Sequence, residues 1–466
     1  MDNLADYIQQ AADWFLPPLV VLVAVIGAFF TFRLRFVQVF RFREAIRETI
    51  ASQQSGGKGA LSPLQSFMTA LAATIGTGNI VGVAVAIVKG GPGALFWMWC
   101  YGFLAMSTKF VEASLGVHYR ATNGDEVLSG PMYYLRDGLK SPRLAQLYAL
   151  VGGLAVLFTT PLTQPNSVAV ATASQLKAHH IALGTWNIGN TQIDVVRLLI
   201  GLTLAVFTWL VIVRGIKSIG RAAEKLSPLK VGLYLIGGIT IFVTHAANLP
   251  EVIQAIFRGA FSLDAVEGGT FGIVMMNAIR YGVSRSVYAN EAGYGTAAVA
   301  YGTAKSQRPD QQGLAAMMDV FIITYITSSI SGLAILLTGT WNKDLDGPAA
   351  IPAAFDDAIP GIGGWMVTVS IFLFGYTVLI GWAYYGEQFL EYLFGPRVIV
   401  PFRWVYCFII PIGAVIKVDA VWNWGDICNG MQIFPNVIGL IGLSGVAAAY
   451  ARMRPPHDVV SPESDK

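Results

Sequence analysis

Residues 71–88 form an apolar stretch long enough to cross a lipid bilayer, but small and polar residues interrupt it in the middle. The interruption consists of Gly76, Thr77, Gly78 and Asn79. A continuous helix satisfies its own backbone groups in lipid, so irregular backbone at this depth needs cover from protein or from a water-filled cavity. The pattern therefore predicts a broken membrane helix, and broken helices near the midplane hold charged substrates and ions in many secondary transporters.

The composition of the whole chain also indicates a membrane protein. Hydrophobic residues make up 54% of the 466 residues and charged residues only 13%, whereas soluble proteins carry about 25% charged residues. Because about 20 apolar residues span a bilayer, we expect an all-α protein with eleven transmembrane helices. Their centres fall near residues 23, 77, 105, 160, 205, 238, 282, 325, 372, 408 and 443.

Basic residues alternate along the chain in a way that predicts its orientation. Most of the 31 lysines and arginines fall in alternate connecting segments, such as the segment that ends at Lys230. The intervening segments hold Lys89, Lys177, Arg258, Lys343 and Lys417. Because cytoplasmic loops are enriched in basic residues, we expect a multi-pass protein of the inner (plasma) membrane with its N-terminus outside and its C-terminus in the cytoplasm. The lipid bilayer explains these charges, so no nucleic-acid partner is expected.

A second Gly-rich interruption lies within residues 268–300, five spans after the first. Because five is an odd number, the unit that starts there is inverted relative to the unit that starts at the first break. Interrupted spans at corresponding positions of two halves indicate an inverted-repeat transporter with its site between the repeats. The expected regions are a peripheral first helix with a basic interfacial helix in 1–63, a first repeat in 64–247, a second repeat in 252–452 and a cytoplasmic tail in 453–466.

The first break carries the residue types of a binding site. Glycine relaxes the steric limits on the backbone, and N–H groups exposed at the start of a half-helix attract anions. We expect Thr77, Gly78 and Asn79 to contact a substrate carboxylate, while Gly78 and the carbonyls of Thr74 and Ile75 face a small cation. The alternative is close helix packing through small residues, which leaves the polar side chain of Asn79 unexplained.

Three further spans supply polar or aromatic candidates. Gln164 follows Pro161 and precedes Pro165 in the fourth span, and we expect its amide to reach the substrate, although hydrogen bonding between helices is the alternative. In the ninth span, the hydroxyl of Thr377 suits a sodium ion. Tyr376, with Phe271 of the seventh span, is expected to limit the substrate side chain, and Asn277 adds a polar group; ordinary packing is the alternative for each aromatic residue.

Several charged residues fall inside spans and need partners there. We expect Glu291 to form a structural ion pair with Arg285. Lys109 and Glu112 are three residues apart on one helix, a spacing that allows an ion pair. Asp319 has no evident partner in the sequence.

Four motifs together resemble those of the alanine or glycine:cation symporter family. They are Gly76-Thr-Gly-Asn-Ile80, Gly130-Pro-Met-Tyr-Tyr-Leu135, Gln164-Pro-Asn-Ser167 and Asn290-Glu-Ala-Gly-Tyr-Gly-Thr-Ala-Ala298. The resemblance covers most of the chain. It implies a leucine-transporter-type fold, a five-plus-five inverted repeat with discontinuous second and seventh helices, and sodium-coupled uptake of small neutral amino acids such as alanine, glycine and possibly serine.

Carried over by position, the resemblance implies a substrate carboxylate at Thr77 and Gly78, a polar contact at Gln164, and sodium between the first break and Thr377. The chain departs from the family where a second hydroxyl residue is common, because Val378 stands there. Proton coupling, a weaker sodium site or another oxygen in its place therefore stays open. A gated channel is less favoured because no ring of pore-lining charge is evident, and an enzyme is not expected because no nucleophile, base and orienting group occur together. No cofactor is expected beyond sodium as a co-substrate.

Overall fold

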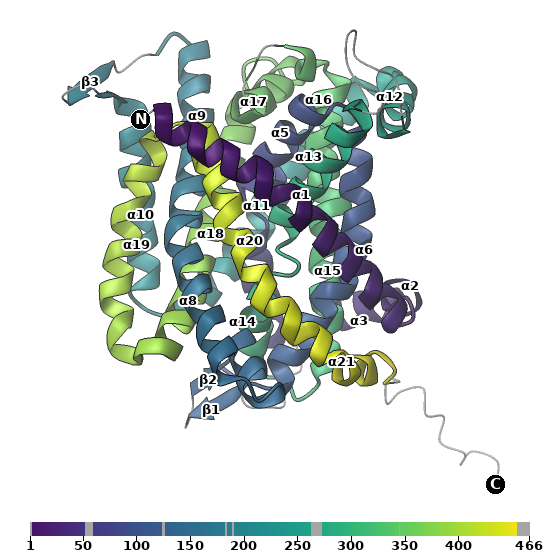
Figure 1. The fold of residues 1–466 in the computed structure, drawn as a ribbon. Coiled ribbons are helices and arrows are strands. Elements are labelled where there is room, and N and C mark those ends of the chain that lie inside the picture. Colours follow the sequence, from purple (N-terminus) through teal and green to yellow (C-terminus); the bar gives the residue numbers. More distant parts are fainter. Residues whose placement is uncertain are drawn as a thin grey trace.

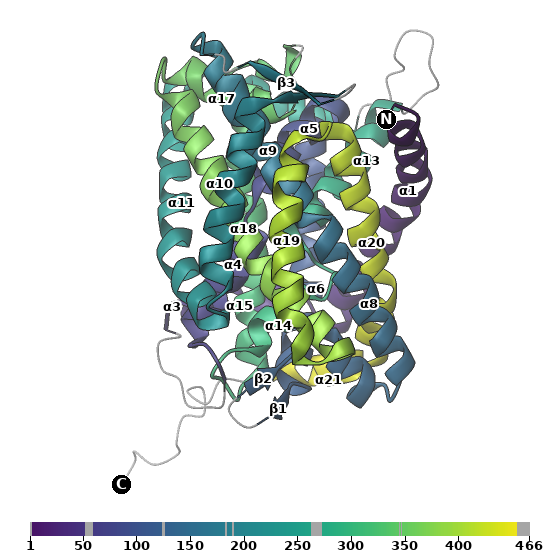
Figure 2. The same cartoon turned by 90° about the vertical axis from the view of Figure 1, so that its left-hand side faces the viewer.

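The computed structural model describes residues 2–51, 59–123, 126–181, 184–188, 191–261, 273–343, 345 and 347–453. These residues are almost entirely helical and form one bundle (Figure 1). The start of α1 (Asp2–Arg33) and the hairpin of β3 (Thr185–Ile188) and β4 (Thr191–Asp194) lie at one end, which we call the N-terminal face. The hairpin of β1 (Ala121–Asn123) and β2 (Glu126–Leu128) lies at the other end, the C-terminal face (Figure 2).

The first half of the chain supplies the helices that lead up to residue 244. They are α2 (Val37–Phe40), α3 (Phe42–Ala51), α4 (Pro63–Thr74), the 3-10 helix η1 (Thr77–Asn79), α5 (Val81–Gly90), α6 (Gly93–His118), α7 (Pro131–Tyr133), the π-helix η2 (Tyr134–Gly138), α8 (Pro142–Phe158), α9 (Thr160–Ala178), α10 (Val195–Ile212) and α11 (Ile216–Thr244). In the antiparallel hairpins, Ala121 lies opposite Leu128 and Thr185 opposite Asp194.

The second half repeats this helical pattern with a break of its own. Its helices are η3 (Ala246–Asn248), α12 (Leu249–Phe261), α13 (Ile273–Asn290), α14 (Thr296–Gly302), α15 (Pro309–Phe321), the π-helix η4 (Ile322–Ser328), α16 (Ser329–Leu337), η5 (Thr340–Asn342), α17 (Gly347–Ala358), α18 (Gly363–Phe394), η6 (Pro396–Val398), α19 (Ile399–Val415), α20 (Val418–Gly442) and α21 (Ser444–Ala451).

Local sequence explains where the helices next to the breaks begin. Ser62 caps α4 by accepting a hydrogen bond from the backbone N–H of Gln65, whose side chain in turn accepts from the N–H of Ser62, and Pro63 follows at the first helical position. This reciprocal pair satisfies N–H groups that the first turn leaves unpaired. In the fourth span, α8 gives way to α9 at Thr159, Pro161 stands in the first turn of α9, and Pro165 lies inside it.

Helices at equivalent positions of the two predicted repeats lie side by side. Helix α5 packs against α13, α6 against α15, α9 against α18 and α10 against α19. Each pair joins an element of the first half to its counterpart in the second half. Two interleaved repeats would produce this arrangement, while their limits at 64–247 and 252–452 remain predictions.

Within the described ranges, seven helices are long and apolar enough to cross a membrane, or up to nine if each of two bent pairs counts as one span. The eleven predicted spans also included α6 and α13. Both helices bury charged side chains, Glu112 and Arg285 among them, which makes them less apolar. The last span was predicted around residue 443, but there the chain bends by 65° between α20 and α21, so the spanning helix lies earlier.

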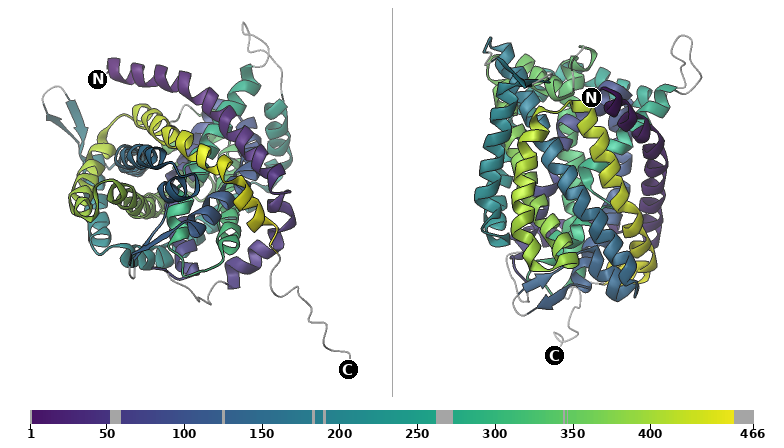
Figure 3. Two further views of the ribbon diagram at one scale, coloured as in Figure 1. Left: turned by 60° about the horizontal axis from the view of Figure 1, so that its bottom comes forward. Right: turned by 60° about the vertical axis from the view of Figure 1, so that its left-hand side comes forward.

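Helix α1 lies outside the paired helices, as predicted for a peripheral first span. It runs diagonally across the bundle and packs along α20 (Figure 1). Viewed toward the C-terminal face, α1 crosses the edge of the bundle (Figure 3, left). A site between the two halves therefore lies among the paired helices and not at α1.

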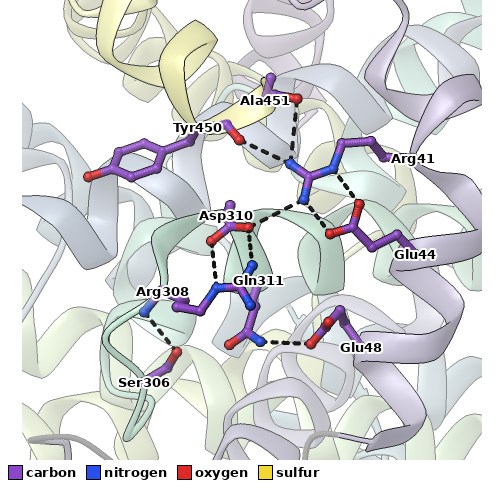
Figure 4. Close-up of polar contacts among 9 residues, drawn as sticks. All are labelled: Arg41, Glu44, Glu48, Ser306, Arg308, Asp310, Gln311, Tyr450 and Ala451. Carbon is purple, nitrogen blue, oxygen red and sulfur yellow. Dashed lines mark hydrogen bonds and ion pairs between the residues drawn. The ribbon is translucent and has the colours of Figure 1, made fainter. Parts of the chain in front are cut away.

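The segment after α1 is docked onto the bundle, and its position along the membrane interface stays a prediction. Arg41, between α2 and α3, donates hydrogen bonds to the carbonyls of Tyr450 and Ala451 and pairs with Glu44 and Asp310 (Figure 4). Burial lowers the pKa of the Arg41 guanidinium, but the hydrogen bonds and charges of Glu44 and Asp310 outweigh burial and raise it.

The neighbouring contacts extend this network along α15. Arg308 pairs with Asp310 at 2.7 Å, and Gln311 donates to Glu48 at 2.8 Å (Figure 4). The network ties α3 to the start of α15 and to the end of α21. The peripheral segment is thereby joined to the second half of the bundle at the C-terminal face.

Candidate functional site

The first break separates α4 from α5 and lies inside the bundle. The two segments Pro63–Thr74 and Thr77–Gly90 meet at 63°, and residues 74–80 are all buried. The side chain of Asn79 donates to the carbonyl of Thr74 at 3.0 Å. Asn79 was predicted to contact substrate, but its amide instead closes the break on itself by satisfying a carbonyl at the end of α4.

Gln164 occupies the hydrogen-bond donors that were predicted for a carboxylate. Its Oε1 atom accepts from the backbone N–H of Thr77 at 3.1 Å and from the Thr77 hydroxyl at 3.0 Å. Helix α9 brings Gln164 to this point. Thr77 and Gln164, which were each predicted to contact substrate, are hydrogen-bonded to each other in the structure, and their contacts with substrate stay predictions.

A narrow cavity lies beside this contact, between the two predicted repeats. Its walls come from the first break, α9, α13, α18 and α20: Ala73, Thr74, Gly76, Gly78, Thr160, Gln164, Tyr288, Ala289, Glu291, Val378, Trp382 and Asn429. A Cβ atom on Gly76 would lie 2.6 Å from Val378, and one on Gly78 would lie 2.8 Å from the ring of Tyr288. Glycine is therefore required at both positions for the break to approach α18 and α13 this closely.

The oxygens predicted to hold sodium converge on the ammonium of Lys230. Its Nζ atom donates to the carbonyl of Ile75 at 2.7 Å, to the carbonyl of Ala72 at 3.3 Å and to the hydroxyl of Thr377 at 2.6 Å. The side chain of Lys230 is fully buried. The sequence had placed Lys230 among the cytoplasmic loop charges, which is wrong because α11 continues as one helix through Pro228 and carries Lys230 into the bundle.

A second buried lysine lies near the same end of the break. The ammonium of Lys109 is 3.8 Å from the carboxylate of Asp319, which also accepts from the hydroxyl of Thr74 at 3.3 Å. Asp319 therefore has the partner that the sequence did not reveal. The predicted ion pair between Lys109 and Glu112 is wrong, because each of these residues has a partner on another helix.

At the second break, between α13 and α14, the carboxylate of Glu112 binds backbone N–H groups that have no partner within the helices. Its Oε1 atom accepts from the N–H groups of Gly293 at 2.8 Å and Gly295 at 3.0 Å, and from the side chain of Asn436 at 3.0 Å. Both glycines adopt positive φ angles, 100° and 86°, which only glycine adopts without steric cost. The second break is thus already filled by an anion that belongs to the chain.

Glu291 faces the cavity at the first break, and the predicted pair with Arg285 is wrong. Its carboxylate accepts from the indole N–H of Trp382 and from the hydroxyl of Thr296, both at 2.7 Å. Arg285 pairs instead with Asp426 of α20, at 2.5 Å. Glu291 lies just beyond the end of α13 with a positive φ of 54°, so it does not continue the helix that carries Arg285.

A contact between α13 and α20 lies between the cavity and a hollow toward the N-terminal face. Tyr288 lines the cavity, Trp422 lines the hollow, and their ring centres are 5.0 Å apart. The guanidinium of Arg285 lies over the Trp422 ring at 5.1 Å. The Arg285–Asp426 ion pair and the two rings thus form a layer that closes the cavity from this side.

Two other predicted residues, Tyr376 and Asn277, are not brought to the cavity. The hydroxyl of Tyr376 donates to the carbonyl of Phe207 on α10 at 3.1 Å, so its ring faces away from the first break. Asn277 lies near the end of α5, where its carbonyl is 3.1 Å from the position of a Cβ on Gly90. Phe271 lies outside the described residues.

The π-helix η4 and the start of α16 hydrogen-bond to both breaks. Thr324 donates to the side chain of Asn290 at 2.9 Å, next to the second break. Ser331 donates to the carbonyl of Asn79 at 2.6 Å, at the first break. π-Helical turns are frequent at functional sites, and this one lies where the two interrupted helices approach the same span.

Comparison with known proteins gives a consistent result over nearly the whole chain. The model of the family described as the sodium:alanine symporter family matches residues 1–453. The sodium/alanine symporter AgcS of Methanococcus maripaludis is 38% identical over 94% of this chain and 94% of its own length. A Bacillus subtilis protein described as the putative sodium/proton-dependent alanine carrier protein YrbD is 31% identical over 95% of this chain and 90% of its own length.

A solved structure supports the fold at low sequence identity. The structure of MhsT in complex with L-phenylalanine is similar with a TM-score of 0.53 and 13% identity, over 84% of this chain and 100% of that chain. The predicted all-α, leucine-transporter-type membrane fold with discontinuous helices is therefore confirmed.

Proposed function

The chain belongs to the sodium:alanine symporter family, and on this premise we propose that it is a secondary active transporter that carries small neutral amino acids together with a cation by alternating access. The membrane is the plasma membrane, with the N-terminal face outside, as the distribution of basic residues favours. Uptake into the cell is the expected direction under an inward cation gradient.

One observation carries the proposal: Gln164, which occupies the hydrogen-bond donors of Thr77, and the carboxylate of Glu291 border the same narrow cavity. Gln164, whose amide oxygen binds the N–H and hydroxyl of Thr77, lines this cavity together with Glu291. A substrate carboxylate that displaces the Gln164 oxygen gains charge-assisted hydrogen bonds from Thr77. The substrate ammonium then faces Glu291, so the charges around the cavity are complementary to those of an amino acid.

The cavity walls favour a short side chain. Val378, Trp382 and Tyr288 line it. The first break is packed closely against Val378 and Tyr288, so the cavity cannot widen unless these residues move. Alanine, glycine and serine are the proposed substrates. Because one methylene in an apolar pocket is worth about 1–3 kcal/mol, the ranking among them depends on small differences in packing.

Alternating access requires a layer that opens while the opposite side closes. The Arg285–Asp426 ion pair and the Tyr288–Trp422 contact form such a layer toward the N-terminal face. We propose that this layer separates when the two repeats rock against each other. Because the cavity lies between elements of both repeats, that motion exposes it alternately to the two sides.

Proton-driven uptake is the second candidate, and one observation favours it. The position predicted for sodium, between Ile75 and Thr377, is filled by the ammonium of Lys230. The family name supports sodium as the driving ion, while the description of the Bacillus relative includes both sodium and protons. Uptake under a sodium gradient and under a proton gradient distinguishes the two driving ions.

The test is uptake of radiolabelled alanine into proteoliposomes under an inward sodium gradient, an inward proton gradient or neither. We expect accumulation above equilibrium under one of the gradients. Thr77→Ala removes a donor to the carboxylate and should lower uptake about tenfold or more, since a hydrogen bond to a charged group contributes about 1.5–3 kcal/mol.

Thr240→Ala is the matched control, because Thr240 is half-buried on α11 away from the cavity and its hydroxyl bonds only to the carbonyl one turn earlier. It should transport like the unmodified protein. Absence of accumulation under every gradient, with alanine, glycine and serine all tested, would overturn the proposed function.

A further inference from the structure

The ammonium of Lys230 has the surroundings of a bound cation. Three oxygen atoms accept its hydrogen bonds, at 2.6, 2.7 and 3.3 Å, and an ammonium has three N–H groups to donate. The ring of Phe374 lies 5.0 Å from Nζ, a distance at which the face of an aromatic ring attracts a cation. The positive charge is thus both hydrogen-bonded and covered.

The oxygens around Lys230 come from the elements that have to move during transport. The carbonyls of Ala72 and Ile75 belong to the end of α4 at the first break, and the hydroxyl of Thr377 belongs to α18. Carbonyls at the C-terminal end of a half-helix attract positive charge. Lys230, from α11, therefore joins the first break to α18 through its charge.

The two acidic side chains near Lys230, Asp319 and Glu291, already have partners and do not require a second cation. Asp319 already pairs with Lys109. On the cavity side, Glu291 is satisfied by Trp382 and Thr296. A sodium ion at this position would need the same oxygens and would lie within a few ångströms of the ammonium, where like charges repel strongly in a buried site.

We propose that the Lys230 ammonium is a tethered cation that replaces a transported sodium ion between the first break and α18. This position then does not bind sodium, and the carbonyl end of the break is neutralised in every state in which Lys230 reaches it. The inference rests on the proposed function only in taking the first break as part of the transport site.

Sodium-specific thermal stabilisation of the purified protein in detergent tests the proposal without any amino acid. The midpoint of unfolding is compared in sodium chloride and in choline chloride of equal concentration, for the unmodified protein, Lys230→Ala and the double variant Lys230→Ala/Thr377→Val. We expect Lys230→Ala to gain a sodium-specific rise of about 2 °C or more that the unmodified protein lacks, since a ligand that binds only the folded state stabilises it. The double variant should lose this rise.

A merely structural role for Lys230 would lower the unfolding midpoint in both salts alike, without any gain from sodium. That result would overturn the proposal. Lys225→Ala is the matched control, because Lys225 is exposed on the same helix, and it should show no sodium-specific change.

Thr377→Val in the otherwise unmodified protein supplies a second measurement that does not depend on the folding of Lys230→Ala. The proposal expects the response to sodium to be the same with and without this change. A sodium-specific rise in the unmodified protein that Thr377→Val removes would show that sodium does bind here and would overturn the inference. Because no substrate is involved, failure of alanine uptake would reject the proposed function alone.

Discussion

The two helix breaks occupy equivalent positions in the two halves, but the chain satisfies them in opposite ways. At the second break, the exposed N–H groups of Gly293 and Gly295 bind the carboxylate of Glu112. At the first break, the N–H of Thr77 binds the neutral amide of Gln164, and the charged group at the break is the ammonium of Lys230 on its carbonyls. One break holds a built-in anion and the other a built-in cation.

This difference indicates which break is open to exchange with a substrate. A carboxylate on buried N–H groups is a strong, charge-assisted contact, so a substrate carboxylate has little to gain by replacing Glu112. A neutral amide oxygen is a weaker acceptor, and a carboxylate that replaces Gln164 at Thr77 gains from its charge. The second break is therefore fixed, while the first is available.

Removal of Glu112 should have the largest effect on stability, because it leaves buried N–H groups of the second break without a hydrogen-bond acceptor. In Glu112→Ala the N–H groups of Gly293 and Gly295 lose their shared acceptor, and each buried unpaired donor costs about 1–3 kcal/mol. We expect thermal unfolding in detergent to shift down by many degrees. Glu251→Ala, at an exposed position on α12, is the control; an unfolding midpoint equal to that of the control would contradict a structural role for Glu112.

The comparison can be sharpened by giving the first break the carboxylate that the second one has. In Gln164→Glu a built-in carboxylate accepts from Thr77, so we expect a folded protein whose affinity for alanine falls tenfold or more, about 1.4 kcal/mol. Equilibrium binding of radiolabelled alanine measures this loss. Gln192→Glu, exposed on β4, should bind normally, and unchanged affinity in Gln164→Glu would show that the Thr77 donors are not the carboxylate site.

A smaller effect is expected for the hydroxyls that join η4 and α16 to the two breaks. Thr324→Val leaves the side-chain oxygen of Asn290 without this donor, and Ser331→Ala does the same for the carbonyl of Asn79. We expect each change to lower the free energy of unfolding by about 1 kcal/mol. If the breaks are coupled through this span, the double variant will depart from additivity by 0.5 kcal/mol or more, measured by chemical denaturation; strict additivity would indicate independent breaks.

The smallest effect is expected for Val378→Thr, which adds a hydroxyl beside the first break at nearly constant volume. While Lys230 fills the cation position, the added oxygen should create no sodium-specific stabilisation, measured by the same comparison of sodium and choline salts. Val367→Thr, on the same helix and buried away from the cavity, is the control for adding a hydroxyl to α18. A sodium response in Val378→Thr but not in Val367→Thr would contradict exclusion of sodium by Lys230.

Sequence reasoning located the first break and Gln164 because both depend on local signals. Glycines inside an apolar run and prolines around a polar amide are visible without knowledge of the fold. The helical character of the chain and the peripheral position of α1 follow from the same kind of pattern.

The charged residues could not be paired from the sequence, because their partners lie on other helices. Lys109 and Glu112 have the spacing of an ion pair, yet Asp319 and the glycines of the second break compete successfully for them. Lys230 was missed because lysines near helix ends usually extend to the membrane surface. Pro228 made a helix end more natural at this point, yet α11 continues through it and carries Lys230 inward.

The π-helix η4 and the start of α16 belong to one span and contact both breaks, so this span connects the two breaks. Thr324 holds Asn290 within the turn, and Ser331, just beyond it, holds Asn79. An α-helix turns by about 100° per residue, so absorbing one residue of the bulge would rotate α16 by that angle relative to α15. Such a rotation would release Ser331 from the first break and leave Thr324 on the second, so it would uncouple the two breaks from each other.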